Sequence, residues 1–152
     1  MGNIFNSDFR DFLQALNNNE VEYLLVGGYA VILHGYSRVT ADMDVWVNRT
    51  EENYKKLVRC FREFGMPVFD MTIEKFLAHR DWDVFRFGRK PVAIDIMTKM
   101  ADLNFIECSA NAKIFEDEEL KIRVVHYNDL IYAKKVAGRG KDLNDLENLQ
   151  AE

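Results

Sequence analysis

The sequence predicts an α/β (α+β) fold, in which helices pack against a mixed β-sheet of about five strands and a short helical tail follows at the C-terminal end. In the first half of the chain, segments with the helical period alternate with short apolar or alternating segments typical of strands. Farther along, two pairs of apolar segments are each divided by a short polar or glycine-containing turn, which is the pattern of a hairpin.

Length and composition agree with one domain that spans residues 1–152. Of the 152 residues, 48% are apolar, and there are only 8 Gly and 2 Pro. This composition excludes a disordered tail, a collagen-like repeat and a small disulfide scaffold. A chain of this length buries roughly 68–70% of the surface that its unfolded form exposes, which is enough for a substantial core.

Helix and strand patterns alternate between residues 7 and 65. The expected elements are a helix capped by Ser7 and ending at Asn17–Asn19, a buried strand over 23–26, a helix over 29–34 stopped by Gly35, a strand over 42–47, and a helix capped by Thr50 and closed by Gly65.

The second half of the chain favours shorter elements. They are a helix over about 72–79, strands over 83–87 and 92–97 joined around Gly88, strands over 114–115 and 120–125 that form a second hairpin, and two helices after Asn128 that are broken at Gly138–Gly140.

Charge and cysteine usage restrict the class of protein. The 25 acidic and 20 basic residues give a net charge of −5. This charge argues against a surface that wraps nucleic acid as a whole, but it is compatible with a local basic groove.

Cys60 and Cys108 belong to no CxxC pair or zinc-type spacing, so we expect reduced, buried thiols. The N-terminal segment lacks the pattern of a secretory signal, and no apolar run approaches the ~20 residues of a membrane span. We therefore expect a soluble, cytoplasmic protein without membrane contact.

Gly27 and Gly28 lie between an expected strand and an expected helix, and two interpretations are open. Glycine lets the backbone approach a ligand closely, and the N–H groups that begin the helix suit a phosphate. Alternatively, the pair only makes a tight turn that needs a positive φ. The surrounding sequence is neither a GxGxxG nor a Walker loop, so those two phosphate-binding motifs are absent.

Asp42 and Asp44 are two apart on an expected strand, so their carboxylates lie side by side on one face. Two like charges at this spacing repel each other unless a cation bridges them or water covers the face. An exposed strand face is the alternative, although Asp is disfavoured in strands.

Asp95 interrupts an otherwise apolar strand, Val92–Met97. Because an unpaired buried carboxylate costs several kcal/mol, Asp95 must be protonated, bind a ligand, or form a salt bridge with an Arg or Lys.

Taken together, these features indicate a magnesium site for phosphoryl or nucleotidyl transfer. Magnesium prefers one or two carboxylates together with substrate phosphates and water. A pair of such ions can activate an attacking hydroxyl and stabilise a triphosphate.

The spacing of these residues resembles the signature of the nucleotidyltransferase superfamily that includes DNA polymerase beta. Gly27-Gly28, thirteen residues, Asp42-Met43-Asp44-Val45 and a later strand Asp95 match it, and Arg38-x-Thr40 extends it upstream. Lys134-x-x-Ala137-x-Arg139-x-Lys141-Asp142-x-x-Asp145 resembles the C-terminal motif of small prokaryotic members: abortive-infection antitoxin-system, minimal and lincosamide-type nucleotidyltransferases. The resemblance spans roughly residues 20–147.

The resemblance implies a role for each matching residue. Asp42, Asp44 and Asp95 would be the catalytic residues and the ligands of one or two Mg²⁺ ions, with Asp95 also the base or orienting group for the incoming hydroxyl. Gly27 and Gly28 would hold the triphosphate. The further nucleotide or substrate contacts would be Arg38, Thr40, Lys134 and Arg139. Asp142 and Asp145 either share in this site or only cap and pair the last helix, and Lys141 has no assigned role.

The implied activity is magnesium-dependent transfer of a nucleoside monophosphate from a nucleoside triphosphate, with ATP expected, to a hydroxyl group of a small molecule, a protein or an RNA. Residues 20–100 would form the catalytic core and 128–152 the C-terminal helices. This leaves little room for an acceptor-binding domain, so a second subunit or a partner is expected to help. The alternative is an antitoxin or partner-binding protein of a toxin–antitoxin system with little or no catalysis. A glycosidase-like carboxylate pair would leave Gly27, Gly28 and Asp95 unexplained.

Overall fold

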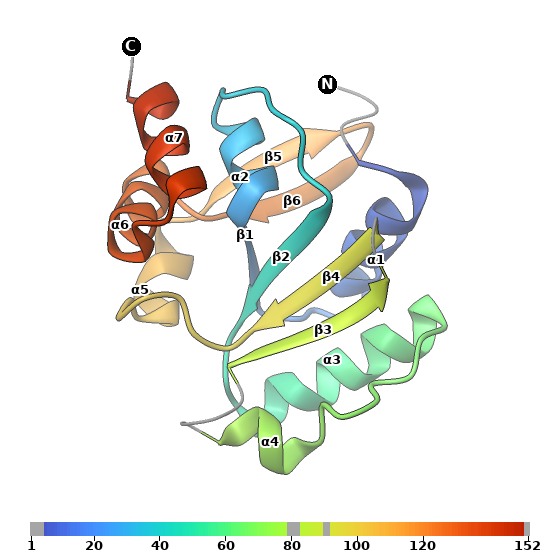
Figure 1. Ribbon diagram of the computed structural model, residues 1–152. Helices are drawn as coiled ribbons and strands as arrows, with labels where there is room; N and C mark the ends of the chain where they lie inside the picture. Colours follow the sequence, from blue (N-terminus) through green and yellow to red (C-terminus); the bar gives the residue numbers. More distant parts are fainter. Residues whose placement is uncertain (1–4, 79–82, 90–91, 151–152) are drawn as a thin grey trace.

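A six-stranded mixed sheet forms the centre of the computed structural model, which describes residues 5–78, 83–89 and 92–150 (Figure 1). Its strand order is β3–β4–β2–β1–β6–β5. The strands are β1 (Tyr23–Val26), β2 (Asp42–Val47), β3 (Val84–Arg89), β4 (Val92–Met97), β5 (Lys113–Asp117) and β6 (Leu120–Val124). The β2–β4 and β1–β6 pairs are parallel and the other pairs are antiparallel. The predicted fold class is confirmed, with six strands in place of about five because both hairpins extend the sheet.

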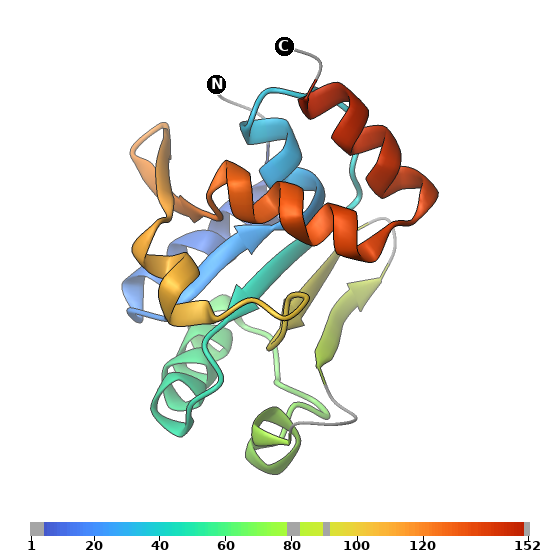
Figure 2. The same ribbon diagram turned by 90° about the vertical axis from the view of Figure 1, so that its left-hand side faces the viewer.

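Helices cover both faces of this sheet (Figure 2). The helices are α1 (Ser7–Asn18), α2 (Gly27–Leu33), α3 (Glu51–Phe64), α4 (Ile73–Leu77), α5 (Phe105–Ala110), α6 (Tyr127–Ala137) and α7 (Gly140–Leu149). Helices α1 and α3 pack together on one face, with α4 beside α3. Helices α2, α5 and α6 lie on the other face, and α7 packs against α6.

The alternation of side chains along β2 separates the core from the site. Phe87, Ile94 and Met43 lie in register on β3, β4 and β2, and the ring of Phe87 contacts Phe61 of α3 at 4.5 Å between centroids. These residues therefore face α1 and α3. Trp46 points the other way and meets Phe105 of α5 at 5.1 Å between centroids. Because side chains alternate along a strand, Asp42 and Asp44 share the face of Trp46.

The ends of the helices follow the predicted capping residues in most places. The hydroxyl of Thr50 accepts a hydrogen bond from the Asn53 N–H, and Gly65 ends α3 with a φ of 87°. The cap of α1 is Asn6, whose Oδ1 accepts from the Phe9 N–H at 2.8 Å, and Ser7 is already helical. The prediction was thus one residue late, since Asn and Ser cap equally well.

Two expectations in the middle of the chain need correction, and one helix was not predicted. Gly88 does not join two strands: it lies within β3, opposite Ala93. The helix expected over 72–79 is α4, which ends at Leu77 because Ala78 is extended, and residue 79 lies outside the described residues. Helix α5 was not predicted, since its six residues, of which only Phe105 and Cys108 are buried, are too few to show a period.

Two expectations about the whole chain can also be compared with the structure. Cys60 and Cys108 are free thiols and buried, as predicted. None of the helices in the described ranges is both long and apolar enough to cross a membrane.

Candidate active site

The strand register brings the three predicted carboxylates together. Asp44 of β2 lies opposite Asp95 of β4 in the parallel pair, and Asp42 lies two residues before Asp44 on the same face. Asp95 is 9% exposed, whereas Asp42 and Asp44 are half-buried. The predicted proximity of these side chains is therefore seen in the structure.

A guanidinium group from a third strand joins this cluster. Arg86 of β3 lies opposite Asp95, and its Nε and Nη2 donate to the two oxygens of Asp95 at 2.9 and 3.0 Å. Its Nη2 also donates to Oδ2 of Asp42 at 3.0 Å. These hydrogen bonds and the charge of Asp95 raise the pKa of Arg86 above its ordinary value, so the group stays charged. Of the three outcomes expected for Asp95, the structure shows the salt bridge.

Asp44 experiences the strongest electrostatic perturbation in the cluster. Burial raises its pKa, and the charge of Asp95 and a hydrogen bond with Asp95 raise it further, to about 7. Lys141 has the opposite effect, because its positive charge favours the ionised carboxylate. A cation bound beside Asp44 would act in the same direction as Lys141.

Gly27 and Gly28 bring backbone against the cluster. Gly27 has a φ of +66°, and a Cβ there would collide with the carboxylate of Asp44. A Cβ on Gly28 would collide with the hydroxyl of Thr40 and would lie 3.2 Å from Nη2 of Arg38. The positive φ expected of this pair is present at Gly27, and both glycines, which begin α2, lie close against side chains of the cluster. Their predicted role in holding a triphosphate remains a prediction.

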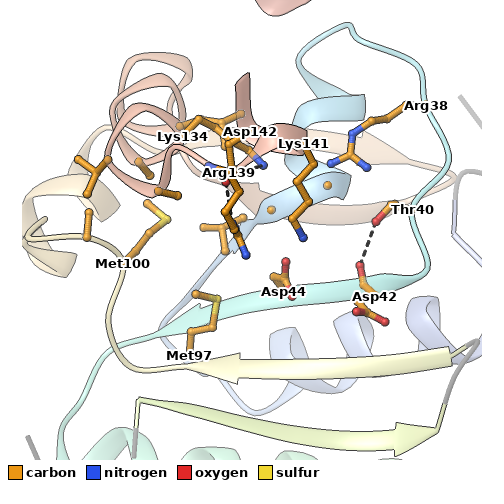
Figure 3. Close-up of a pocket in the computed structure, with 18 of the residues that line it drawn as sticks. Arg38, Thr40, Asp42, Asp44, Met97, Met100, Lys134, Arg139, Lys141 and Asp142 are labelled. Atoms are coloured by element: carbon orange, nitrogen blue, oxygen red, sulfur yellow. Dashed lines mark hydrogen bonds and ion pairs between the residues drawn. The ribbon is translucent and has the colours of Figure 1, made fainter. Parts of the chain in front are cut away.

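A cavity of about 480 Å³ opens beside Asp42, Asp44 and the two glycines that begin α2 (Figure 3). Lys141 of α7 and Arg139, the N-cap residue of α7, reach into it toward the strands, and Nε of Arg139 donates to Oδ2 of Asp142 at 2.7 Å. Apolar side chains also line the cavity, among them Met97, Met100, Leu130, Ala133 and Val136. Met97 and Met100 lie toward one end of the cavity, and Asp42 and Thr40 lie toward the other (Figure 3).

Buried ion pairs hold the C-terminal helices over the cavity. Lys134 is 7% exposed, and its Nζ lies 3.1 Å from Oδ1 of Asp142 and 3.0 Å from Oδ2 of Asp145. Arg38 binds Asp145 from the loop before β2, with Nε to Oδ1 at 2.8 Å. Asp142 also accepts from the N–H of Arg139 and caps α7.

These ion pairs alter the interpretation of the predicted phosphate contacts. Lys134 borders the cavity, but both carboxylates beside it take up its ammonium group, so we assign it to holding α6 against α7. Asp142 and Asp145 cap and pair the last helix, which was one of the two roles expected for them. Thr40 also borders the cavity, and its hydroxyl donates to the carbonyl of Asp42 at 3.4 Å.

The carboxylates suit a hard divalent cation. Carboxylate oxygens are the ligands that magnesium prefers, and Oδ1 of Asp42 is buried with no hydrogen-bond partner among the described residues. As the side chains stand, no three His, Cys, Asp or Glu residues in the described ranges are arranged to hold a metal ion. Arg86 takes three of the six oxygens of Asp42, Asp44 and Asp95. The donor set therefore fits the cation, provided that Arg86 moves away.

Two charged residues of this site, Arg86 and Lys141, have no role that the sequence alone predicts. In the sequence, Arg86 alternates with Phe85 and Phe87, which places it on the polar face of its strand. This pattern alone does not identify it as a residue of the site. Its partner across the sheet depends on the register of a hairpin, which the sequence does not define. Lys141 was noticed in the motif, but its direction into the cavity depends on how α7 packs.

Comparison with known proteins supports the assignment of the fold. The sequence matches the family model "Nucleotidyltransferase of unknown function (DUF6036)" over residues 7–151. A comparison with curated proteins found no matching sequence.

Three solved structures are similar to this one: two are described as a nucleotidyltransferase and an adenylyltransferase, and the third is a complex with an adenylylated compound. TM1012 of Thermotoga maritima, described as a nucleotidyltransferase, has a TM-score of 0.64 at 17% identity over 91% of this chain and 88% of its own. The lincosamide antibiotic adenylyltransferase LnuA has a TM-score of 0.60 at 16% identity over 98% of both chains. ANT(2″)-Ia in complex with adenylyl-2″-tobramycin has a TM-score of 0.57 at 15% identity over 93% of this chain and 84% of its own.

At such low identities, the similar structures show a shared fold and not a shared substrate. The family match and these structures confirm the resemblance to the nucleotidyltransferase superfamily that the motifs indicated. Because the family model covers residues 7–151 of the 152, the chain belongs to this family of nucleotidyltransferases of unknown function.

Proposed function

We propose that this protein is a magnesium-dependent enzyme that moves a nucleoside monophosphate from a nucleoside triphosphate, with ATP as the expected donor, to a hydroxyl group of an acceptor. The observation that carries the proposal is the register of β2 and β4, which sets Asp44 opposite Asp95 and Asp42 beside them. The family assignment and the cavity next to Asp42 and Asp44 support it.

The proposed reaction exchanges one bond at phosphorus for another. The hydroxyl oxygen of the acceptor bonds to the α-phosphorus, the bond from that phosphorus to the bridging oxygen breaks, and pyrophosphate leaves. We assign Asp95 the task of accepting the hydroxyl proton. Asp42, Asp44 and Asp95 would hold magnesium, which supplies electrostatic stabilisation of charge on the triphosphate oxygens.

The two ends of the cavity suit the two ends of a nucleotide. Arg139 and Lys141 provide positive charge for the triphosphate on the side of Asp44. The apolar side chains of Met97, Met100 and Leu130 suit the nucleoside. Gly27 and Gly28 border the cavity and bring their backbone next to Asp44 and Thr40, where backbone N–H groups suit phosphate oxygens.

Candidate acceptors include small molecules, proteins and RNA. Two of the similar proteins are described with antibiotics, namely LnuA with lincomycin and ANT(2″)-Ia with an adenylylated tobramycin. A small hydroxyl-bearing molecule is accordingly the first acceptor class to test. A second copy of the chain, or a toxin protein, would be the expected source of any further acceptor contacts.

A thermal-shift screen tests the proposed donor site. The protein is heated with ATP, GTP, CTP or UTP, with and without Mg²⁺, beside the variants Asp44→Asn and Asp11→Asn. Asp11 is an exposed residue of α1, outside the cavity, and serves as the matched control. A ligand at ~100 times its dissociation constant adds about 2.7 kcal/mol to the free energy of unfolding, which is readily detected.

The proposal predicts a shift that needs Mg²⁺, persists in Asp11→Asn and disappears in Asp44→Asn. If no nucleotide shifts the transition of the unaltered protein, the donor site is wrong. In that case the partner-binding role in a toxin–antitoxin system takes precedence.

A further inference from the structure

The positively charged side chain of Arg86 lies within the carboxylate cluster. Arg86 donates from two nitrogens to both oxygens of Asp95, at 2.9 and 3.0 Å, and from Nη2 to Asp42 at 3.0 Å. Bidentate pairing of this kind is the strongest arrangement between arginine and a carboxylate. The guanidinium group therefore bridges two of the three proposed metal ligands, Asp95 of β4 and Asp42 of β2.

Sheet geometry makes this contact specific. Arg86, Asp95 and Asp44 lie side by side on β3, β4 and β2 in that order, so all three side chains stand on one face. The reach of Arg86 past Asp95 to Asp42 joins the edge strand to the central strand. The contact thus follows from the register of three strands.

Arg86 is also free to leave this position. Its side chain is 46% exposed, whereas the side chains of Asp42 and Asp95 are 29% and 12% exposed. Because this long side chain is half exposed, water can hydrate its guanidinium group when it turns outward, whereas the two carboxylates are fixed by the sheet. Movement of Arg86, and not of the strands, is the route by which the oxygens become available.

We propose that Arg86 is a positioning residue that holds Asp42 and Asp95 in place until a divalent cation displaces it. The inference rests on the proposed function, because it assumes that Asp42, Asp44 and Asp95 bind the cation. Oδ2 of Asp42 cannot accept the hydrogen bond from Arg86 and coordinate the cation equally well, because the two positive charges repel each other. Arg86 therefore lowers metal affinity, and its departure accompanies metal binding.

The net charge of the cluster predicts how cation affinity changes when Arg86 is replaced. Three carboxylates and one guanidinium leave two net negative charges, and removal of Arg86 leaves three when all of the carboxylates are ionised. Divalent cations bind more tightly as the ligand charge increases. A charge-assisted hydrogen bond lost on displacement corresponds to about tenfold in affinity, so the variant Arg86→Met is expected to bind the cation about tenfold more tightly.

Binding of Mn²⁺ alone, followed by the electron paramagnetic resonance signal of the free ion, tests the inference. The variants are Arg86→Met, which removes the charge, and Arg86→Lys, which keeps it. Arg10→Met is the matched control, because Arg10 also pairs with a buried aspartate, Asp117, but at the β5 edge of the sheet. Arg86→Gln serves as a second neutral variant if Arg86→Met does not fold.

A spectroscopic readout follows Arg86 directly. In protein labelled with ¹⁵N-arginine, the Nε–H signal of Arg86, assigned from its absence in Arg86→Lys, is recorded during a titration with diamagnetic Mg²⁺. The inference predicts that this signal moves toward the position of a solvated arginine, whereas that of Arg10 does not. A purely structural ion pair would give no such change.

The inference holds if Arg86→Met binds Mn²⁺ about tenfold more tightly while Arg86→Lys and Arg10→Met bind like the unaltered protein. Equal affinities in all four proteins, with an unmoved Arg86 signal, would overturn it and leave the proposed function standing. If neither the unaltered protein nor Arg86→Met binds Mn²⁺, with or without ATP, the metal site of the proposed function is wrong and the inference fails with it.

Discussion

Asp44 and Asp95 lie directly opposite each other on the parallel strands β2 and β4, although they are far apart in the sequence. Parallel strands cannot be joined by a tight turn, and here α3, α4 and β3 lie between them. The proximity of the two carboxylates therefore depends on how this connection packs. The site is a product of the sheet register and not of a local motif alone.

Substitution of Gly27 tests the close approach to Asp44. In Gly27→Ala, the φ of +66° and the collision with the Asp44 carboxylate should lower the free energy of unfolding by about 1–3 kcal/mol. The same collision should weaken Mg²⁺-dependent nucleotide binding about tenfold or more, as measured by calorimetry.

Gly65→Ala is the matched control for this backbone effect. Gly65 also has a positive φ, at +87°, but a Cβ there would meet nothing within 4 Å. We expect a comparable loss of stability in urea unfolding with unchanged nucleotide affinity. If both variants kept normal nucleotide binding, the contact of Gly27 with Asp44 would have no part in the site.

Lys141 is the cavity residue whose role the motif left open. Its side chain points toward Asp44, and Lys141→Met should weaken triphosphate binding about tenfold, because one charge-assisted contact is lost. Lys135 is an exposed lysine of α6 outside the cavity, and Lys135→Met should leave the affinity unchanged. A larger effect at Lys135 than at Lys141 would place the triphosphate elsewhere.

Much of this arrangement could be predicted from short-range patterns. The alternation along residues 42–47 gave the face shared by Asp42 and Asp44, and the apolar run around Asp95 predicted that its charge had to be compensated. Thr50 and Gly65 predicted both ends of α3, since capping depends on one or two residues.

Long-range features could not be predicted in the same way. The partner of Asp95 is Arg86, and only the register of β3 against β4 selects it among the many basic residues. Lys134 belongs to the predicted C-terminal motif, but its burial beside Asp142 and Asp145 depends on the packing of α6 on α7. Residues in such contacts carry no periodic signal of their own.

The buried ion pairs should make a large contribution to stability. Asp145 is 1% exposed and is paired with Arg38 and Lys134, so Asp145→Ala leaves buried positive charge uncompensated. We expect a loss of about 3–5 kcal/mol in the free energy of unfolding, measured in urea.

The matched control is an exposed ion pair, Lys55 with Glu51, in which the side chains are 65% and 64% exposed. Lys55→Met should change the free energy of unfolding by less than about 0.5 kcal/mol. Similar effects in both variants would show that the pairs around Asp145 contribute no more than surface charges.

The two thiols should be unreactive in the folded protein. Burial raises the pKa of Cys60 and of Cys108 to about 12. At pH 8, a thiol reagent should therefore label neither residue rapidly until urea unfolds the chain. Rapid labelling of the folded protein would contradict the burial of these side chains.

The same pKa values predict how the free energy of unfolding changes with pH. Unfolded thiols ionise from about pH 9, whereas the folded thiols retain their protons to about pH 12. The unfolded state thus loses protons first, and the free energy of unfolding falls as the pH rises through this window. A double variant, Cys60→Ala with Cys108→Ala, should lose less stability between pH 9 and 11, as followed by urea unfolding.

Calorimetric titration with a non-hydrolysable ATP analogue tests most directly whether the carboxylates of β2 and β4 carry a cation that binds the triphosphate. We expect the unaltered protein to bind the analogue at least about tenfold more tightly with Mg²⁺ than without, and Asp44→Asn to remove this difference. Equal affinity with and without Mg²⁺, unchanged in Asp44→Asn, would contradict it.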